Sequence, residues 1–225
     1  MPAVRIFKKE PCLFSQRVLV TAIEKGIEFE SVLIDTANKP EWFLKLSPYG
    51  KVPVLQHGDS VVFESSIILE YLDEAFPGVP IMPSAPLERA RARFWIDFAN
   101  SRLHPCFMDL LKAPAASFAP AVTAFEDALS RIEAELASSD MPSPYFMGPA
   151  FSLVDAAFGP AFERFAVLPA HRGYALPDRF KRLLAWKRTL ESRPSLVRTA
   201  CTLDRHLANT RRYLPEELRA GRVAA

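Results

Sequence analysis

Residues 47–66 of the chain read Ser-Pro-Tyr-Gly-Lys-Val-Pro-Val-Leu-Gln-His-Gly-Asp-Ser-Val-Val-Phe-Glu-Ser-Ser. The apolar runs at 52–55 and 61–63 flank a Gly-Asp turn, and this pattern predicts a β-hairpin. Ser65 or Ser66 then stands where a serine hydroxyl caps the first free amides of a helix, which continues to residue 76. A hairpin followed directly by a helix is therefore the local arrangement around which the N-terminal fold is built.

Upstream of this hairpin, strand and helix patterns alternate. Residues 4–7 and 29–34 have the β-branched and aromatic composition of strands, and residues 14–24 carry an apolar stripe at helical spacing. Gly26 stands where a glycine commonly ends a helix. The order strand, helix, strand, then strand, strand, helix predicts a small sheet with helices packed on it.

Downstream, the composition changes at residue 80. Residues 80–86 are rich in Pro, Ser and Ala, which is typical of a linker, and the apolar residues beyond them recur at helical spacing. We expect helices over 87–98, 122–136, 151–165 and 180–190, with Pro105 kinking or ending the first of them. The sequence therefore divides into an α/β domain of residues 1–80 and an all-helical domain of residues 86–225.

The composition excludes several classes of protein. The chain has 225 residues, 49% of them hydrophobic, and its net charge of +2 argues against both global disorder and a dedicated nucleic-acid binder. No apolar stretch approaches the ~18 residues of a membrane span, so no membrane partner is expected. Three widely spaced cysteines fit neither a disulfide framework nor a zinc site. We therefore expect a cytoplasmic protein that binds no metal.

Cys12 directly follows a predicted strand and precedes a predicted helix. A single cysteine is most often a small buried apolar residue. At the N-terminus of a helix, however, the free amides and the helix dipole stabilise a thiolate, which is the nucleophile of disulfide exchange. Ser15 occupies the position where a resolving cysteine would stand, so a mixed disulfide at Cys12 needs an external thiol for its release.

Two further motifs stand near the same end of the predicted sheet. Pro53 interrupts a strand, and a cis peptide bond after Val52 is one way to accommodate it, which would leave the Val52 backbone free for a peptide-like ligand. Glu64 and Ser65 stand at the start of a helix, where capping is the simple interpretation. The same amides and hydroxyl also bind a carboxylate, and Glu64 would pair with an ammonium group beside it.

In chain order, these motifs resemble those of the cytosolic glutathione transferase superfamily, and most closely its cysteine-bearing, omega-like class. The motifs are Cys-x-Phe-Ser-x-Arg-Val at 12–18, Asn-Lys-Pro-Glu-Trp-Phe at 38–43, Ser-Pro-Tyr-Gly-Lys-Val-Pro-Val-Leu at 47–55, Glu-Ser-Ser-Ile at 64–67 and Glu-Tyr-Leu-Asp-Glu-Ala-Phe-Pro-Gly at 70–78. The likeness is dense over residues 4–85. Beyond them, Ser152 and Asp155 resemble the family's buried N-capping box, which is a folding element.

The resemblance implies a thioredoxin-like N-terminal α/β domain and an all-α C-terminal domain, with glutathione as co-substrate in the cleft. Cys12 would be the catalytic thiol that forms a mixed disulfide with glutathione. The Val52 backbone would pair with the cysteinyl part of glutathione, and Pro53 would be cis. The family's motif usually has Pro after the cysteine, whereas here Leu13 follows it.

The resemblance also assigns the two ends of glutathione. Glu64 and Ser65 would hold the γ-glutamyl end, and Lys39 would neutralise the glycyl carboxylate. For Lys39, the alternative is a solvated loop lysine. The second substrate is expected between the domains, against the helix that carries Phe94, Phe98 and Arg102 and near His206 or Tyr213. Because the family is usually dimeric, a homodimer is expected.

A cysteine at position 12 favours a glutathione-dependent thiol transferase, which would reduce dehydroascorbate or small disulfides and remove glutathione from mixed disulfides. The first alternative is conjugation of glutathione to electrophiles, for which Tyr or Ser at this position would be typical. The second alternative is a non-catalytic binding or regulatory protein that keeps the same fold.

Overall fold

The computed structural model describes residues 4–138 and 143–220, so the outer ends of both expected domains, 1–3 and 221–225, lie outside the described residues. The N-terminal region has the order β1 (Val4–Lys8), α1 (Leu13–Glu24), β2 (Phe29–Leu33), α2 (Glu41–Leu46), β3 (Val54–His57), β4 (Ser60–Phe63) and α3 (Ser65–Ala75). The rest is helical: α4 (Pro86–Phe98), the π-helical turn η1 (Ala99–Leu103), α5 (His104–Lys112), α6 (Ala115–Ala137), α7 (Leu153–Phe165), α8 (Leu168–Arg172), α9 (Lys181–Glu191), α10 (Pro194–Thr199), α11 (Leu203–Thr210), the 3-10 turn η2 (Arg211–Tyr213) and α12 (Glu216–Ala220). The predicted fold class, a thioredoxin-like α/β region followed by an all-α region, is confirmed.

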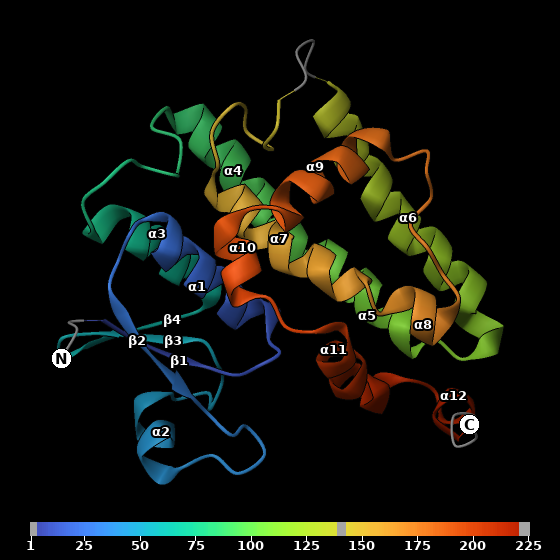
Figure 1. The fold of residues 1–225 in the computed structure, drawn as a ribbon, viewed down its shortest axis with the longest axis horizontal. Coiled ribbons are helices and arrows are strands. Elements are labelled where there is room, and N and C mark those ends of the chain that lie inside the picture. Colours follow the sequence, from blue (N-terminus) through green and yellow to red (C-terminus); the bar gives the residue numbers. More distant parts are fainter. Residues whose placement is uncertain (1–3, 139–142, 221–225) are drawn as a thin grey trace.

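The sheet is mixed, with the strand order β2-β1-β3-β4. Strand β1 pairs in parallel with β2, because α1 carries the chain back between them, and antiparallel with β3. The hairpin β3-β4 extends the sheet, as predicted, although its strands include Gln56, His57 and Ser60 beyond the expected runs. Helices α1 and α3 cover one face and α2 covers the other (Figure 1). The cluster Phe7, Ile34, Phe43 and Val54 fills the α2 side.

Helix α1 ends as the sequence predicts. Gly26 follows its last turn with φ +65°, and its amide donates to the Ile23 carbonyl at 3.0 Å. Residues without a Cβ adopt this left-handed conformation at little cost, which is why a glycine stands here.

The linker between α3 and α4 is fixed to the N-terminal region. The Asp73 carboxylate accepts hydrogen bonds from the amides of Ile81 (2.9 Å) and Met82 (3.0 Å) and pairs with Lys25 Nζ at 3.0 Å. The side chains of Lys25 and Asp73 are only 1% and 4% exposed, so water barely screens this pair.

Helices α4 and α5 form one continuous rod through the π turn, whereas the sequence predicted that Pro105 would kink or end the first helix. The turn ends at Leu103, and Pro105 lies in the first turn of α5. Proline lacks the amide hydrogen that a helix interior needs, and the π turn shifts the hydrogen-bond pattern of the helix just before Pro105. The turn also brings Asn100 toward the N-terminal region, where its Oδ1 accepts from Arg17 Nη1 at 2.8 Å.

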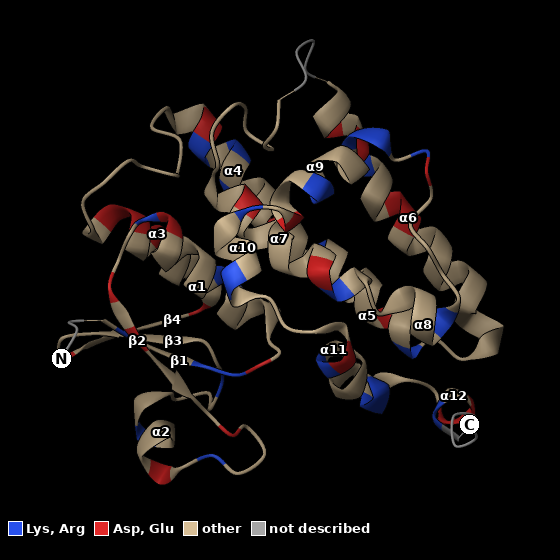
Figure 2. Ribbon diagram, in the orientation of Figure 1, with Lys and Arg blue, Asp and Glu red and all other residues tan. Residues whose placement is uncertain are grey.

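The two regions share a continuous hydrophobic core, which runs from Ile6 and Leu55 in the sheet to Phe158 and Trp186 among the helices. Helix α1 packs against α7 at its centre, and Gln16 Nε2 donates across this interface to the Glu163 carboxylate at 2.5 Å. Acidic and basic side chains are interspersed over both regions (Figure 2).

The predicted capping box at the start of α7 is confirmed. Asp155 accepts from the Ser152 amide at 2.8 Å and from the Ser152 hydroxyl at 2.6 Å. Within the described residues, no helix combines the length and the apolarity needed to cross a membrane.

Candidate functional site

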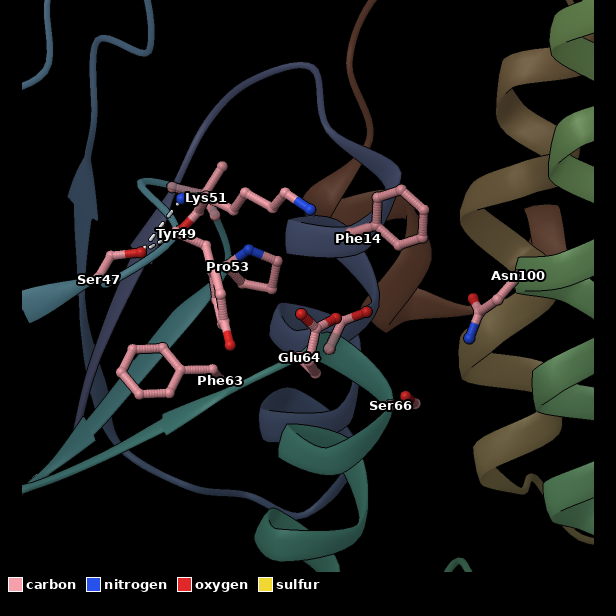
Figure 3. Close-up of a pocket in the computed structure, with 11 residues that line it drawn as sticks. Phe14, Ser47, Tyr49, Lys51, Pro53, Phe63, Glu64, Ser66 and Asn100 are labelled. Atoms are coloured by element: carbon pink, nitrogen blue, oxygen red, sulfur yellow. Dashed lines mark hydrogen bonds between the residues drawn. The ribbon is translucent and has the colours of Figure 1, made fainter. Parts of the chain in front are cut away.

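A first cavity of about 290 Å³ opens where the sheet ends and α3 begins (Figure 3). Segments that are distant in sequence meet here: the start of α1, the loop that precedes β3, the start of α3 and the π turn. Its lining residues are Phe14, Ser47, Tyr49, Lys51, Val52, Pro53, Phe63, Glu64, Ser65, Ser66 and Asn100. Four of the residues singled out in the sequence, Val52, Pro53, Glu64 and Ser65, therefore lie together.

The start of α3 differs from the expected serine cap. Glu64 occupies the position before the helix with φ 61° and ψ 117°, and Ser65 is already helical. Within the described part of the chain, no side chain caps the first turn. A non-glycine residue in this backbone conformation costs about 1–3 kcal/mol and is typical of functional sites. Because no side chain occupies them, the first amides of α3 remain available to an anion in the cavity.

Pro53 follows a cis peptide bond from Val52, as the interrupted strand pattern suggested. Strand β3 begins only at Val54, which explains how a proline is tolerated so close to the sheet. Among the described residues, the amide and carbonyl groups of Val52 make no hydrogen bond. Since Val52 lines the first cavity, these groups are available to the backbone of a ligand.

The two lysines near the cavity differ in their positions. Lys39 does not line it, and its side chain packs against Gly50, where an added Cβ would lie 3.3 Å from Lys39 Nζ. Lys51 does line the cavity, and its side chain reaches across the opening toward Phe14 (Figure 3). Sequence reasoning missed Lys51, although it stands inside the Ser-Pro-Tyr-Gly-Lys-Val-Pro motif, two residues before the cis proline.

Cys12 borders a second cavity of about 260 Å³, which adjoins the first through the shared residue Phe14. As predicted, Cys12 stands at the N-terminus of α1, in the capping position with φ −144° and ψ 115°. The lining residues are Lys9, Pro11, Cys12, Leu13, Phe14, His104, Phe107, Met108, Arg164, Asn209, Thr210, Arg212 and Tyr213. A substrate could thus occupy both cavities with its reacting atoms beside Cys12.

Two buried arginines flank Cys12. Arg17 is 1% exposed, and its guanidinium carbon lies 4.8 Å from the ring centroid of Phe14. Its Nε has no hydrogen-bond partner among the described residues. Burial lowers the pKa of Arg17 to about 10, and a thiolate at Cys12 opposes that shift. Burial also lowers the pKa of Arg164, whereas the neighbouring Glu163 and Cys12 act to raise it. Cations so placed attract the thiolate form of a cysteine.

The other two cysteines have different surroundings. Burial raises the pKa values of Cys106 and Cys201, in both cases with a carboxylate nearby that acts in the same direction. All three cysteines are free thiols. Of the three, Cys12 is the one that occupies the capping position of a helix among the described residues.

The wall of the second cavity partly corrects the sequence-based expectation. Tyr213 lines it, whereas Phe94, Phe98 and Arg102 line a separate cavity of about 640 Å³ between α4 and α6. Helix α4 turns Ala92, Trp95 and Ile96 inward, which leaves Phe94 59% exposed on its outer side. His206 is buried behind the wall, where its Nδ1 accepts from Arg164.

Comparison with known proteins places the fold in a family. Residues 11–75 match the family description "Glutathione S-transferase, N-terminal domain", and residues 88–186 match "Glutathione S-transferase, C-terminal domain". This chain belongs to the glutathione S-transferase family. The first match spans the start of α1, the cis proline and the start of α3, which are the elements that build the first cavity.

Relatives of this transferase carry different class names. It is 32% identical over 197 residues to glutathione S-transferase U19 of Arabidopsis thaliana, covering 84% of this chain and 85% of the relative. It is also 32% identical over 167 residues to glutathione S-transferase omega-1 of Sus scrofa, covering 73% and 68%. The structure of rice GST1 in complex with glutathione superposes with a TM-score of 0.83 at 30% identity, covering 93% and 95%.

Titratable side chains of the transferase form no metal centre within the described residues. No group of three or more His, Cys, Asp or Glu side chains there is arranged to hold a metal ion. His104, which borders the second cavity, packs edge-on against Phe14 with 5.3 Å between ring centroids. Burial, with Arg17 and Arg164 nearby, lowers the pKa of His104 to about 4, so the imidazole is neutral at pH 7.

Proposed function

We propose that this glutathione transferase is a glutathione-dependent thiol transferase of omega type with Cys12 as its nucleophile. The observation that carries the proposal is the position of Cys12, at the N-terminus of α1 and beside Arg17 and Arg164. Helix amides and cations stabilise a thiolate, and a thiolate attacks disulfides. The omega-1 relative supports the same class. Because the U19 relative carries a different class name, conjugation of glutathione to electrophiles stays the alternative.

Glutathione would lie in the first cavity. Its γ-glutamyl carboxylate would bind the free amides of α3 and the Ser65 hydroxyl, with Glu64 beside the ammonium group. Its cysteinyl backbone would pair with Val52, next to Pro53. The glycyl carboxylate would pair with Lys39, or with Lys51, whose side chain reaches over the cavity.

The reaction would proceed in two exchanges. The Cys12 thiolate attacks the glutathionyl sulfur of a mixed disulfide RS–SG, the Cys12–SG bond forms, and RS⁻ leaves and takes up a proton. A glutathione thiolate then attacks the Cys12–SG bond, which releases oxidised glutathione and restores the Cys12 thiolate. With dehydroascorbate as substrate, two glutathione molecules likewise supply the two electrons.

Mass spectrometry after incubation with oxidised glutathione tests the proposal. We expect a glutathionyl adduct on Cys12 that reduced glutathione removes, no adduct on Cys12→Ser, and an unchanged adduct in the control variant Cys106→Ser. If glutathione binds but Cys12 stays unmodified, conjugation or a non-catalytic role replaces thiol transfer. If glutathione does not bind, the assignment of the first cavity is wrong.

We also propose that the chain forms a homodimer in the cytoplasm. The exposed Phe94 borders a cavity that also contains Phe98 and charged residues of both signs, a composition suited to a self-complementary interface. Free cysteines are compatible with a reducing compartment. Light scattering on the wild type and on Phe94→Glu tests the dimer, because a charge on this surface should shift the mass to that of one chain.

A further inference from the structure

The second cavity has positive charge in its wall and no acidic residue among the described residues that line it. Its cations are Lys9, Arg164 and Arg212. None of the three forms an ion pair with a carboxylate within the part of the chain that the structure describes. The cavity therefore presents the positive charge of these three side chains to whatever enters it beside Cys12, while Glu163 stands behind Arg164 and is joined to it through His206.

Arg164 is a fixed cation at the base of the cavity. It is 5% exposed, and its Nη1 donates to Nδ1 of His206, whose Nε2 in turn donates to Glu163. Glu163 is held in addition by Gln16 Nε2 at 2.5 Å and by the Cys201 amide at 3.0 Å. The Arg164 guanidinium makes no other hydrogen bond within the described residues, so its remaining N–H groups are available to a ligand.

The rim adds a second guanidinium and an aromatic surface. Arg212 is exposed, its guanidinium carbon lies 4.7 Å from the ring centroid of Tyr213, and its Nη2 donates to the Tyr213 hydroxyl at 2.7 Å. Figure 2 shows basic residues where α11 ends. Phe14, Phe107 and Met108 add apolar surface to the same lining. About 260 Å³ suits a ring-sized group rather than a large molecule.

We propose that the second cavity binds a ring or other apolar group that carries a carboxylate. The preferred substrates are therefore mixed disulfides between glutathione and small anionic thiols. Arg164 and Arg212 hold the carboxylate, and Phe14, Phe107 and Tyr213 contact the ring. Buried guanidinium groups bind carboxylates with charge-assisted hydrogen bonds, which are about twice as strong as neutral ones. The inference rests on the proposed function, because the glutathionyl half of the same molecule must occupy the first cavity.

The reaction is the first exchange proposed above, the attack of Cys12 on RS–SG, and the leaving group is now a thiolate that carries a carboxylate. Cys12 takes the glutathionyl sulfur, and the carboxylate-bearing thiolate RS⁻ departs from the second cavity with its carboxylate still bound to arginine. No oxidant or reductant other than glutathione is required.

A pair of unreactive thioethers tests the charge recognition without any turnover. S-(4-carboxybenzyl)glutathione and S-(4-carbamoylbenzyl)glutathione differ only in carboxylate against amide, and their dissociation constants can be measured by calorimetry. We expect the carboxylate to bind at least 10-fold more tightly to the wild type. Arg164→Gln should reduce the ratio to below about 3-fold. Arg212→Gln, an exposed change with little bearing on folding, should reduce it by a smaller factor.

The matched control is Arg211→Gln. Arg211 is the exposed neighbour of Arg212 in sequence, but it does not line the second cavity. This variant should keep the wild-type ratio. Equal affinity of the two thioethers for the wild type would overturn the inference and leave the proposed function intact. Preferential binding of the carboxylate without an adduct on Cys12 would support the inference while the proposed thiol transfer fails. If neither thioether binds, both fall.

Discussion

Replacing Asp155 with alanine should destabilise the protein more than any other single loss of polar contacts described above. The Asp155 side chain is fully buried and joins three parts of the helical region. It accepts from the Phe146 amide at 3.0 Å, from the amide and hydroxyl of Ser152 at 2.8 and 2.6 Å, and from Trp186 Nε1 at 2.7 Å.

The magnitude follows from the donors that would lose their partner. In Asp155→Ala, the amides of Phe146 and Ser152 and the indole of Trp186 remain buried without an acceptor, at about 1–3 kcal/mol each. The Ser152 hydroxyl can rotate, so it adds little. Burial raises the pKa of Asp155, which means that removing the carboxylate returns part of its own desolvation penalty. We therefore expect a loss of about 3–5 kcal/mol, a large share of the 5–15 kcal/mol typical of a domain.

Urea unfolding followed by Trp fluorescence and circular dichroism measures this loss. The midpoint should fall while the dependence on denaturant stays the same. Ser152→Ala removes only the cap hydroxyl and should cost about 1 kcal/mol. A loss below 1 kcal/mol in Asp155→Ala would refute the reasoning, because water or a rearranged acceptor would then satisfy these donors.

Two further predictions concern charges near Cys12. Burial lowers the pKa of Arg17 to about 10, which corresponds to a penalty of about 3 kcal/mol, and the contacts of Arg17 with Asn100 and Phe14 partly offset it. Arg17→Met should therefore raise the free energy of unfolding by about 1–2 kcal/mol and slow the alkylation of Cys12 by iodoacetamide. A less stable variant would contradict this. Burial also lowers the pKa of His104 to about 4, so the folded state binds fewer protons than the unfolded state between pH 4 and 6.5. Stability from this group is complete above pH 6.5 and falls by about 3 kcal/mol toward pH 4. Unfolding curves of His104→Gln should lack that part of the decline.

Sequence patterns predicted most of the N-terminal fold because its signals are local. The hairpin, the glycine that ends α1, the cysteine at the start of α1 and the capping box at Ser152 each depend on residues within a few positions of one another. The cis peptide bond before Pro53 could also be predicted from the sequence, since a proline inside a strand pattern requires an explanation. The serine cap of α3 was wrong because the strained backbone of Glu64 starts the helix one residue earlier.

The missed features are contacts between distant segments. Arg164 reaches the Cys12 cavity from α7, and nothing near Arg164 in the sequence marks it, because a buried arginine and a surface arginine have the same local pattern. Arg17 likewise follows the helical stripe of α1, and only the structure places it next to Asn100 of the π turn. Lys51 differs, because its place within the motif at 47–55 was a signal that could have been used. Lys39 stays a prediction.

The interface between α1 and α7 limits how this gene could be recombined. The Pro-rich segment at 80–86 looks like a natural junction, at which the helical half of a relative could be exchanged. Yet Gln16 meets Glu163 across the interface, and Glu24 pairs with Arg193. A chimera joined at this segment would bring together surfaces that never adapted to each other. The residues that meet across this interface would have to be changed to match each other before Cys12 and Arg164 again lined one cavity.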